Sequence, residues 1–322
     1  MGAGVAVIGA GRMGPGIALA FAAGGCPALL VGRGAPQLQR AQAAFDEALA
    51  GLAQHNLLDR DSARAAAGRF QLTTDLARIG ASQVVIEATP EALESKQELF
   101  AQMEARVGPE TILASNTSGL PITQIAARAR RPQRVVGMKF VNPAHLVPLV
   151  EVVKGEATAR ESVTQACGLL RQIGKRPVAV MRDVPGFLNN RIQQAMRREA
   201  ISLVARGIAS AEDVDAAVRW GFGFRLLGAG TLETMDLVGL EQILTIHEYI
   251  IPDLEASPEP SALLRELVAR GDTGVRAGRG FLTWDEERER AARARMDALL
   301  IEGLKLARRW EGDEATRTAE SA

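Results

Sequence analysis

Residues 5–14 read Val-Ala-Val-Ile-Gly-Ala-Gly-Arg-Met-Gly, and an apolar segment, Ile17–Phe21, follows them. The first four residues are typical of a short strand that is buried on both faces of a sheet. Strand, G-x-G-x-x-G turn and helix in this order form a dinucleotide site, because N–H groups at the helix N-terminus can approach a pyrophosphate. A tight turn without a ligand is the alternative. We predict nucleotide binding at Gly9, Gly11, Arg12, Met13 and Gly14.

Short apolar runs and helical patterns alternate along the first half of the chain. After the first strand we predict strands at residues 28–31, 70–72, 84–86, 111–114, 135–136, 149–153 and 177–181. The longest helical pattern between them is Pro36–Leu58, where apolar residues recur at a spacing of three and four. This alternation predicts an α/β fold with a doubly wound, mostly parallel sheet of the Rossmann type.

The pattern changes at Asp183–Phe187, and only helical patterns follow. We predict a long helix at Leu188–Val204, a second at Ala211–Trp220 with Ser210 as its N-cap, and an exposed, charged final helix at Glu286–Trp310. The expected organisation is a nucleotide-binding Rossmann-type domain at residues 1–183, an all-α domain at 184–311 and a flexible tail at 312–322.

The composition excludes several classes of protein. Of 322 residues, 38 are Lys or Arg and 38 are Asp or Glu, so the chain lacks the basic excess of nucleic-acid binders. Its apolar runs are shorter than the ~20 residues that a membrane span needs, and the first strand begins too early to leave room for a leader peptide. Two cysteines, Cys26 and Cys167, and three scattered histidines indicate neither a disulfide framework nor a metal site. We therefore expect a cytoplasmic protein without a metal.

The end of the second predicted strand bears on which dinucleotide binds. NAD-binding chains usually place a carboxylate about 20 residues beyond the glycines, where it holds the ribose 2′-OH. Here that position is Gly32, and Arg33 follows it. A missing carboxylate removes repulsion of a 2′-phosphate, and an arginine can pair with one. We therefore predict that Arg33 binds the cofactor and that NADP(H) is slightly preferred over NAD(H). A solvated arginine, or one stacked on the adenine of either cofactor, is the alternative.

A charged pair is predicted within the apolar segment Gly137–Val153. Lys139 belongs to a first apolar run and Glu151 to a second, and Asn142-Pro143 lies between them as a turn. A strand–turn–strand arrangement could bring the two side chains face to face. Unpaired buried charge is expensive, so such a pair is either a structural ion pair at a sheet edge or part of a catalytic site.

Five motifs in this order are more diagnostic of a family together than any one of them alone: Gly9–Gly14, Glu87–Lys96, Ser115–Leu120, Gly137–Val153 and Pro185–Arg191. Jointly they resemble the 3-hydroxyacyl-CoA dehydrogenase family, over most of the chain to about Leu240. The resemblance implies a Rossmann-type domain and then a helical domain through which the protein forms a homodimer. It also implies hydride transfer between a nicotinamide cofactor and the C3 carbonyl or hydroxyl of a small-molecule substrate.

The resemblance further implies roles for individual residues. Ser118 and Asn190 match residues that contact the substrate, and Glu151 matches the residue that pairs with the catalytic acid–base group. The residues that match positions on the nicotinamide side of the cofactor are Glu91, Lys96 and Asn116. Each has a structural alternative, because serine and asparagine cap helices and a Glu–Lys pair near a helix start is often a surface pair.

One position departs from the family pattern. The family places a histidine before the aromatic residue of the Asn-Pro motif, and this chain has Lys139 there. A histidine with a pKa of ~6.5 exchanges protons at neutral pH, whereas a lysine beside Glu151 stays charged. An ammonium is a poor base but can donate a proton and stabilise a carbonyl oxygen that gains negative charge. We therefore predict Lys139 as catalytic in a carbonyl or imine reduction. One alternative is that His145 in the same segment serves as the acid or base. Another is that the site no longer catalyses a reaction.

Clues to the substrate disagree. Asp236–Leu240 is similar to the acyl-CoA enzymes, whereas Leu232–Met235 is similar to the L-gulonate 3-dehydrogenase and lambda-crystallin branch, whose substrate is a free sugar acid. In the CoA enzymes the part between Pro36 and Phe70 helps hold the coenzyme; here it contains no lysine, and its basic residues are Arg40, Arg60, Arg64 and Arg69, so a CoA phosphate site stays an open alternative. We predict an NAD(P)-dependent oxidoreductase for a 3-hydroxyacyl-CoA or a small 3-hydroxy acid. The alternatives are an imine or amino-acid oxidoreductase and a non-catalytic, crystallin-like nucleotide-binding dimer.

Overall fold

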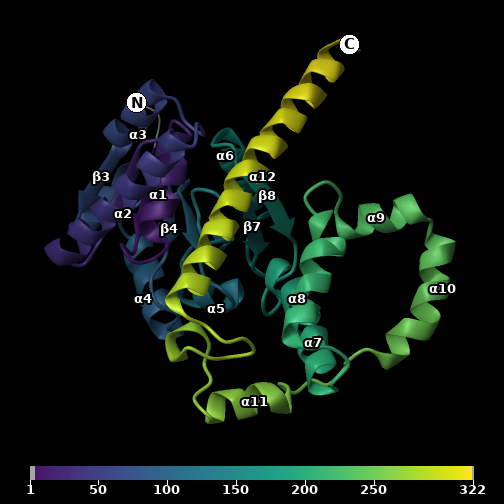
Figure 1. The fold of residues 1–322 in the computed structure, drawn as a ribbon. Helices are drawn as coiled ribbons and strands as arrows, with labels where there is room; N and C mark the ends of the chain where they lie inside the picture. Colours follow the sequence, from purple (N-terminus) through teal and green to yellow (C-terminus); the bar gives the residue numbers. More distant parts are fainter. Residues whose placement is uncertain (1–3, 321–322) are drawn as a thin grey trace. The chain divides into compact units, whose positions relative to one another are not determined.

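The computed structural model describes residues 4–320, with side chains described up to residue 310. The chain divides into two compact units (Figure 1). The first consists of residues 1–190 together with 300–322, and the second of residues 191–299.

The first unit is built on one eight-stranded sheet. Its strands are β1 (Gly4–Ile8), β2 (Ala28–Val31), β3 (Phe70–Thr73), β4 (Ser82–Glu87), β5 (Ile112–Ser115), β6 (Val135–Phe140), β7 (Leu149–Lys154) and β8 (Arg176–Val180). They lie in the order β3-β2-β1-β4-β5-β6-β7-β8, and all neighbours are parallel except β6 and β7. The chain winds outward in both directions from β1, which confirms the predicted doubly wound, mostly parallel sheet.

Helices pack on the sheet through two separate cores. The helices of this unit are α1 (Gly14–Ala23), α2 (Ala35–Gln54), α3 (Arg60–Arg69), α4 (Leu93–Glu104), α5 (Ile122–Ile125) and α6 (Arg160–Gln172). Successive strand residues point to opposite faces, so on β4 Val84 and Ile86 join one core and Val85 the other. The first core includes residues of α1, α2, α3 and α6, and the second includes residues of α4 and α5.

The second unit is helical, as predicted. Its helices are α7 (Asn189–Ala205), which begins in the first unit, α8 (Ala211–Trp220), α9 (Thr231–Val238), α10 (Leu240–Ile250) and α11 (Ala262–Ala269). The Ser210 side chain accepts a hydrogen bond from the Asp213 N–H and so caps α8 as predicted. Short 3-10 helices occur in both units at Leu76–Ala81, Ala126–Arg128, Pro132–Arg134, Phe222–Phe224, Ile251–Asp253 and Val275–Ala277.

The last helix, α12 (Glu286–Glu320), differs from the predicted exposed segment. From residue 300 onward it belongs to the first unit, where Ile301 is buried in the first core and Leu304 packs against that core. These two residues lie three apart and so on one face of the helix. The helical part that folds as the second unit therefore ends before residue 300, whereas the sequence placed that end at 311. The predicted tail at 312–322 has a helical backbone to Glu320, and its last two residues lie outside the described part.

No helix within residues 4–320 combines the length and apolar character that crossing a membrane requires. Among the described side chains, those of residues 4–310, no group of three or more His, Cys, Asp or Glu residues is placed to hold a metal ion. Cys26 and Cys167 are both free thiols.

Candidate active site

The glycine turn after β1 has the geometry expected of a dinucleotide site. Gly9 has a φ of 118°, and a Cβ there would lie 2.4 Å from the carbonyl oxygen that follows β4. A Cβ at Gly14 would lie 2.1 Å from the Gly9 carbonyl oxygen, so only glycine lets α1 pack this closely on β1. A Cβ at Gly11 would meet no atom within 4 Å. Open space at a helix N-terminus suits a pyrophosphate. Arg12 and Met13 in the same turn are exposed and half-buried, respectively.

Arg33 lies just beyond β2 and is exposed. Its backbone N–H donates to Gln37 Oε1 at 2.8 Å, which anchors the loop to the start of α2. A Cβ at Gly32 would come within 2.6 Å of the Leu38 side chain. The position where NAD-binding chains place a carboxylate is therefore closed to any side chain unless Leu38 moves.

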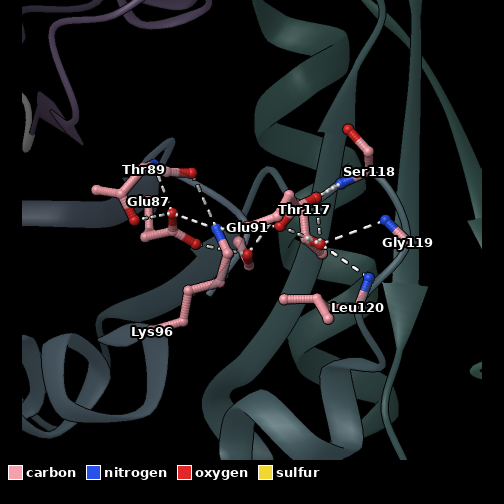
Figure 2. Close-up of polar contacts among 9 residues, drawn as sticks. Glu87, Thr89, Glu91, Lys96, Thr117, Ser118, Gly119 and Leu120 are labelled. Carbon is pink, nitrogen blue, oxygen red and sulfur yellow. Dashed lines mark hydrogen bonds and ion pairs between the residues drawn. The ribbon is translucent and has the colours of Figure 1, made fainter. Parts of the chain in front are cut away.

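A buried carboxylate organises the loops at the carboxyl ends of β4 and β5 (Figure 2). Glu87 is fully buried, and its Oε1 accepts from Thr89 N–H (2.5 Å), Thr89 Oγ1 (2.6 Å) and Lys96 Nζ (2.6 Å). Its Oε2 accepts from Ser115 Oγ at 2.6 Å. Four donors thus satisfy the buried charge. Sequence reasoning missed the role of Glu87; the available signal was a carboxylate directly after an apolar strand, with a lysine on the next helix.

Glu91 ties this cluster to the loop after β5. Its carboxylate accepts from Thr117 Oγ1, 2.9 Å from each oxygen, and from the Ser118 N–H. Lys96 Nζ lies 3.4 Å from Glu91 Oε2, so the fully buried Lys96 bridges Glu87 and Glu91. The structure therefore brings the predicted cofactor residues Glu91 and Lys96 together. The Ser118 hydroxyl is directed away from the Glu91 carboxylate (Figure 2).

Asn116, the third predicted residue of the nicotinamide side, links this cluster to β6. Its backbone N–H donates to the Glu87 carbonyl oxygen at 2.7 Å, and its Oδ1 accepts from the Phe140 N–H at 2.8 Å. Phe140 directly follows Lys139, so the amide of Asn116 fixes the end of the strand that carries the lysine.

Lys139 and Glu151 face each other, as the sequence predicted. They are directly paired residues of the antiparallel strands β6 and β7, and Lys139 Nζ lies 2.7 Å from Glu151 Oε2. Only 8% of the Lys139 side chain and 1% of the Glu151 side chain are exposed. The ammonium lies 5.9 Å from the centroid of the Phe187 ring, whose face attracts a cation. Lys139 therefore lies buried between a carboxylate and an aromatic ring.

The start of α7 holds the other oxygen of the glutamate. Glu151 Oε1 accepts from the N–H groups of Leu188 (2.7 Å) and Asn189 (2.8 Å). Gly186 and Phe187 precede these residues with positive φ values of 76° and 52°, and they turn the chain into the helix. A carboxylate at a helix N-terminus is favourable, since the unpaired N–H groups there need acceptors. The backbone therefore fixes the orientation of Glu151.

Asn190 connects the remaining predicted catalytic residues. Its Nδ2 donates to the Ser118 carbonyl oxygen at 3.2 Å. Because it follows directly on the residues that bind Glu151, the structure brings Lys139, Glu151, Ser118 and Asn190 into one region. His145 lies beside α1: its Nδ1 is 3.5 Å from where a Cβ at Gly16 would lie, and the residue also lines a cavity that extends to Gly24 at the end of the helix.

Comparison with protein families covers both parts of the chain. Residues 4–184 match the NAD binding domain of 3-hydroxyacyl-CoA dehydrogenase, and residues 186–284 match its C-terminal domain. The chain belongs to the 3-hydroxyacyl-CoA dehydrogenase family. It is a nicotinamide-dependent oxidoreductase that acts on CH–OH groups, so the predicted family and enzyme class are confirmed.

Similar proteins in this family act on different substrates. The chain is 33% identical to 5-formyl-3-hydroxy-2-methylpyridine 4-carboxylate 5-dehydrogenase of Mesorhizobium japonicum over 298 residues, which are 92% of this chain and 96% of that protein. It is 34% identical to 3-hydroxybutyryl-CoA dehydrogenase of Bradyrhizobium diazoefficiens over 278 residues, which are 86% of this chain and 94% of that protein.

Solved structures differ in how much of the chain they match. The crystal structure of 5-formyl-3-hydroxy-2-methylpyridine 4-carboxylic acid 5-dehydrogenase, an NAD+-dependent dismutase, matches with a TM-score of 0.87 at 32% identity and covers 97% of this chain and 99% of its own. The crystal structure of (S)-3-hydroxybutyryl-CoA dehydrogenase PaaH1 from Ralstonia eutropha matches with a TM-score of 0.73 at 32% identity. This match covers 88% of this chain and 99% of the Ralstonia chain. Because α12 has 35 residues, a match over 97% of 322 residues must include most of this helix.

Proposed function

We propose that this enzyme reduces the carbonyl group of a small free acid, with the Lys139 ammonium as proton donor. The observation that carries the proposal is the Lys139–Glu151 pair, with its 2.7 Å contact and the two backbone N–H groups on the far oxygen of the glutamate. Glu151 accepts a hydrogen bond from one N–H of the ammonium. An ammonium has three N–H donors, so two remain for other partners, such as a substrate oxygen.

The chemistry follows from this fixed charge. When bound, the nicotinamide cofactor supplies the hydride. As the carbonyl carbon gains the hydride, its oxygen becomes negative; Lys139 stabilises that charge and donates a proton, which leaves a hydroxyl product and a neutral amine. Water then returns a proton to the amine. Oxidation would need Lys139 to accept a proton, and an ammonium has no acceptor. We assign hydrogen bonds to the substrate to Ser118 Oγ and the Asn190 side chain.

The support for a free acid is the likeness to the pyridine-carboxylate enzyme, whose TM-score of 0.87 exceeds the 0.73 of the Ralstonia enzyme. The segment between Pro36 and Phe70 contains no lysine, and its basic residues are Arg40, Arg60, Arg64 and Arg69. The substrates to test first are 3-oxo acids and ring aldehydes that carry a carboxylate, the latter because the Mesorhizobium relative is named for one.

We propose NADP(H) as the slightly preferred cofactor. The support is the exposed Arg33 after β2, together with Gly32, which offers no carboxylate where NAD-binding chains usually place one. The family description and the Mesorhizobium-type crystal structure both refer to NAD. A comparison of the dissociation constants for NADH and NADPH decides between the two cofactors.

We also propose a homodimer formed through the second unit. Neither α9 nor α10 buries a single residue within the described chain. Leu232 and Leu237 on α9 are 76% and 78% exposed, and Leu244 and Tyr249 on α10 are also exposed. Apolar surface on this scale marks a protein interface, and a second copy of the chain would cover it. Sedimentation should show twice the 34.3 kDa chain mass. Leu237→Glu should give monomers, Leu299→Glu on α12 should not, and a monomeric wild type would refute the dimer.

The function is tested by a substrate screen that monitors nicotinamide absorbance with both cofactors. We expect reduction of free oxo acids or ring aldehyde acids, and at least tenfold lower kcat/KM for 3-oxoacyl-CoA. The substitution Lys139→His should shift the enzyme toward oxidation of hydroxy acids, since imidazole accepts a proton at neutral pH. Lys154→Met, which changes a lysine of β7 that bonds only nearby carbonyls, is the control. Tight cofactor binding without turnover of any substrate would show a non-catalytic protein instead.

A further inference from the structure

The carboxyl ends of β1 and β4 lie side by side at the point where the strand order reverses. In doubly wound sheets a dinucleotide binds across this crevice, with its pyrophosphate at the glycine turn after β1 and its adenosine ribose at the end of β2. The nicotinamide end therefore extends to the other side, over the loops that follow β4 and β5. Glu91 lies in that half of the site, because it belongs to the loop after β4 and its carboxylate bonds to the loop after β5.

This half of the site contains two carboxylates and one ammonium. Glu87 and Lys96 are both fully buried and lie 2.6 Å apart, so their charges cancel. Glu91 lies 3.4 Å from the same ammonium, but its side chain is 42% exposed. Among the side chains of residues 4–310, no second cation forms an ion pair with either glutamate. The cluster of Glu87, Lys96 and Glu91 therefore keeps one net negative charge, and Glu91 is its exposed member.

The protein holds the carboxylate of Glu91 in a fixed position. It accepts from Thr117 Oγ1 at 2.9 Å and from the Ser118 N–H, and Lys96 approaches it from the other side (Figure 2). Lys96 is itself held, since its Nζ also donates to the Thr89 carbonyl oxygen at 3.2 Å. A charge that is fixed in this way needs no reorganisation during a reaction, which is what makes preorganised electrostatics effective.

A nicotinamide ring changes its charge when it reacts: it is a cation in the oxidised cofactor and neutral in the reduced one. A fixed negative charge on this side of the site attracts the oxidised ring and has little effect on the reduced ring. Charge placed near the ring is one of the means by which a protein tunes such a cofactor. Because donating a hydride creates the cation, the same attraction favours hydride transfer to a carbonyl group.

We propose that Glu91, positioned by Lys96 and Glu87, strengthens binding of the oxidised cofactor relative to the reduced one and so makes the bound reduced cofactor a stronger hydride donor. The hydride takes two electrons and one proton from the ring to the carbonyl carbon, so no further oxidant or reductant is needed. The effect on affinity rests on the nicotinamide dependence of the family. Its consequence for carbonyl reduction rests on the proposed function.

The test is titration of the full-length protein, without substrate, with the oxidised and the reduced form of the cofactor that it prefers. Both forms share the adenosine and the pyrophosphate, so the ratio of their dissociation constants reports on the ring. Glu91→Gln keeps an acceptor for the Ser118 N–H but removes the charge, and it should shift this ratio toward the reduced form by at least about fivefold. Glu91→Asp keeps the charge and should retain most of the wild-type ratio.

Two controls separate the charge of Glu91 from its role in the fold. Glu94→Gln removes an exposed carboxylate from the first turn of α4 and should leave the ratio within about twofold of the wild-type value, because a solvated charge is screened. ADP-ribose, or its 2′-phosphate if the protein prefers NADP(H), carries no nicotinamide, so Glu91→Gln should leave its affinity unchanged.

A ratio that Glu91→Gln leaves unchanged would overturn the proposal. An equal loss of affinity for ADP-ribose and for both forms of the cofactor would overturn it too, because the residue would then act only through the fold of its loop. Neither measurement depends on turnover, so this proposal can fail while carbonyl reduction is observed, and the proposed reduction can fail while the shift in affinity is observed.

Discussion

Replacing either member of the Lys139–Glu151 pair alone should destabilise the protein nearly as much as replacing both. Lys139→Met leaves a carboxylate that is 1% exposed with only its two backbone donors. Removing one partner of a buried pair costs 3–5 kcal/mol in general, and the two remaining donors place this case at about 3 kcal/mol. Glu151→Gln keeps a neutral acceptor near the ammonium, so we expect about 2 kcal/mol.

The double variant Lys139→Met/Glu151→Gln buries no net charge. Its loss should be about 3 kcal/mol, which gives a coupling energy of about 2 kcal/mol between the two residues. Urea unfolding at pH 7 measures all four proteins, and the coupling should change little with salt because the pair is buried. Glu302 and Lys305 on α12 form a pair at the same 2.7 Å, with 67% and 32% of their side chains exposed, so their cycle should show a coupling well below that of the buried pair. Strictly additive losses for Lys139 and Glu151 would refute the ion pair.

Three further predictions follow from other parts of the first unit. Lys96→Met leaves the fully buried Glu87 without its cationic partner, so it should cost about 3 kcal/mol in urea unfolding and weaken cofactor binding; unchanged stability would contradict the bridge. Folded Lys175 has a pKa of about 8, below the 10.5 of the unfolded chain, so the unfolded state binds more protons between these values and stability rises with pH there. From pH 7 to 9.5 the wild type should therefore gain about 2 kcal/mol relative to Lys175→Met, and parallel pH profiles would contradict this. Arg33→Ala should weaken NADPH binding about tenfold and leave NADH binding unchanged. An equal loss of affinity for both cofactors would indicate that Arg33 stacks on the adenine instead.

The sequence predicted most of the sheet because its strands are short apolar runs that both cores bury. The predicted strand at 28–31 and the predicted helix at 211–220 have the bounds of β2 and α8. The facing of Lys139 and Glu151 was also predictable, since a turn between two apolar runs allows antiparallel pairing, and β6 and β7 do pair in this way.

Other features depend on contacts that the local pattern does not encode. Glu87 is satisfied by donors from three separate segments, so its role required the three-dimensional structure. The N–H groups that hold Glu151 are positioned by the positive φ of Phe187, a conformation that a phenylalanine in sequence does not announce. In α12, the apolar pair Ile301 and Leu304 was outweighed by the surrounding charge, and so its packing on the first core was missed.

The most direct test of the account is the rate of hydride transfer in a single turnover by Lys139→Met, with cofactor affinity measured on the same protein. If the ammonium stabilises and protonates the substrate oxygen, the rate should fall at least about 100-fold while the cofactor dissociation constant stays within about twofold of the wild-type value. A wild-type rate in this variant, or a loss that comes entirely from weaker cofactor binding, would contradict the role of Lys139.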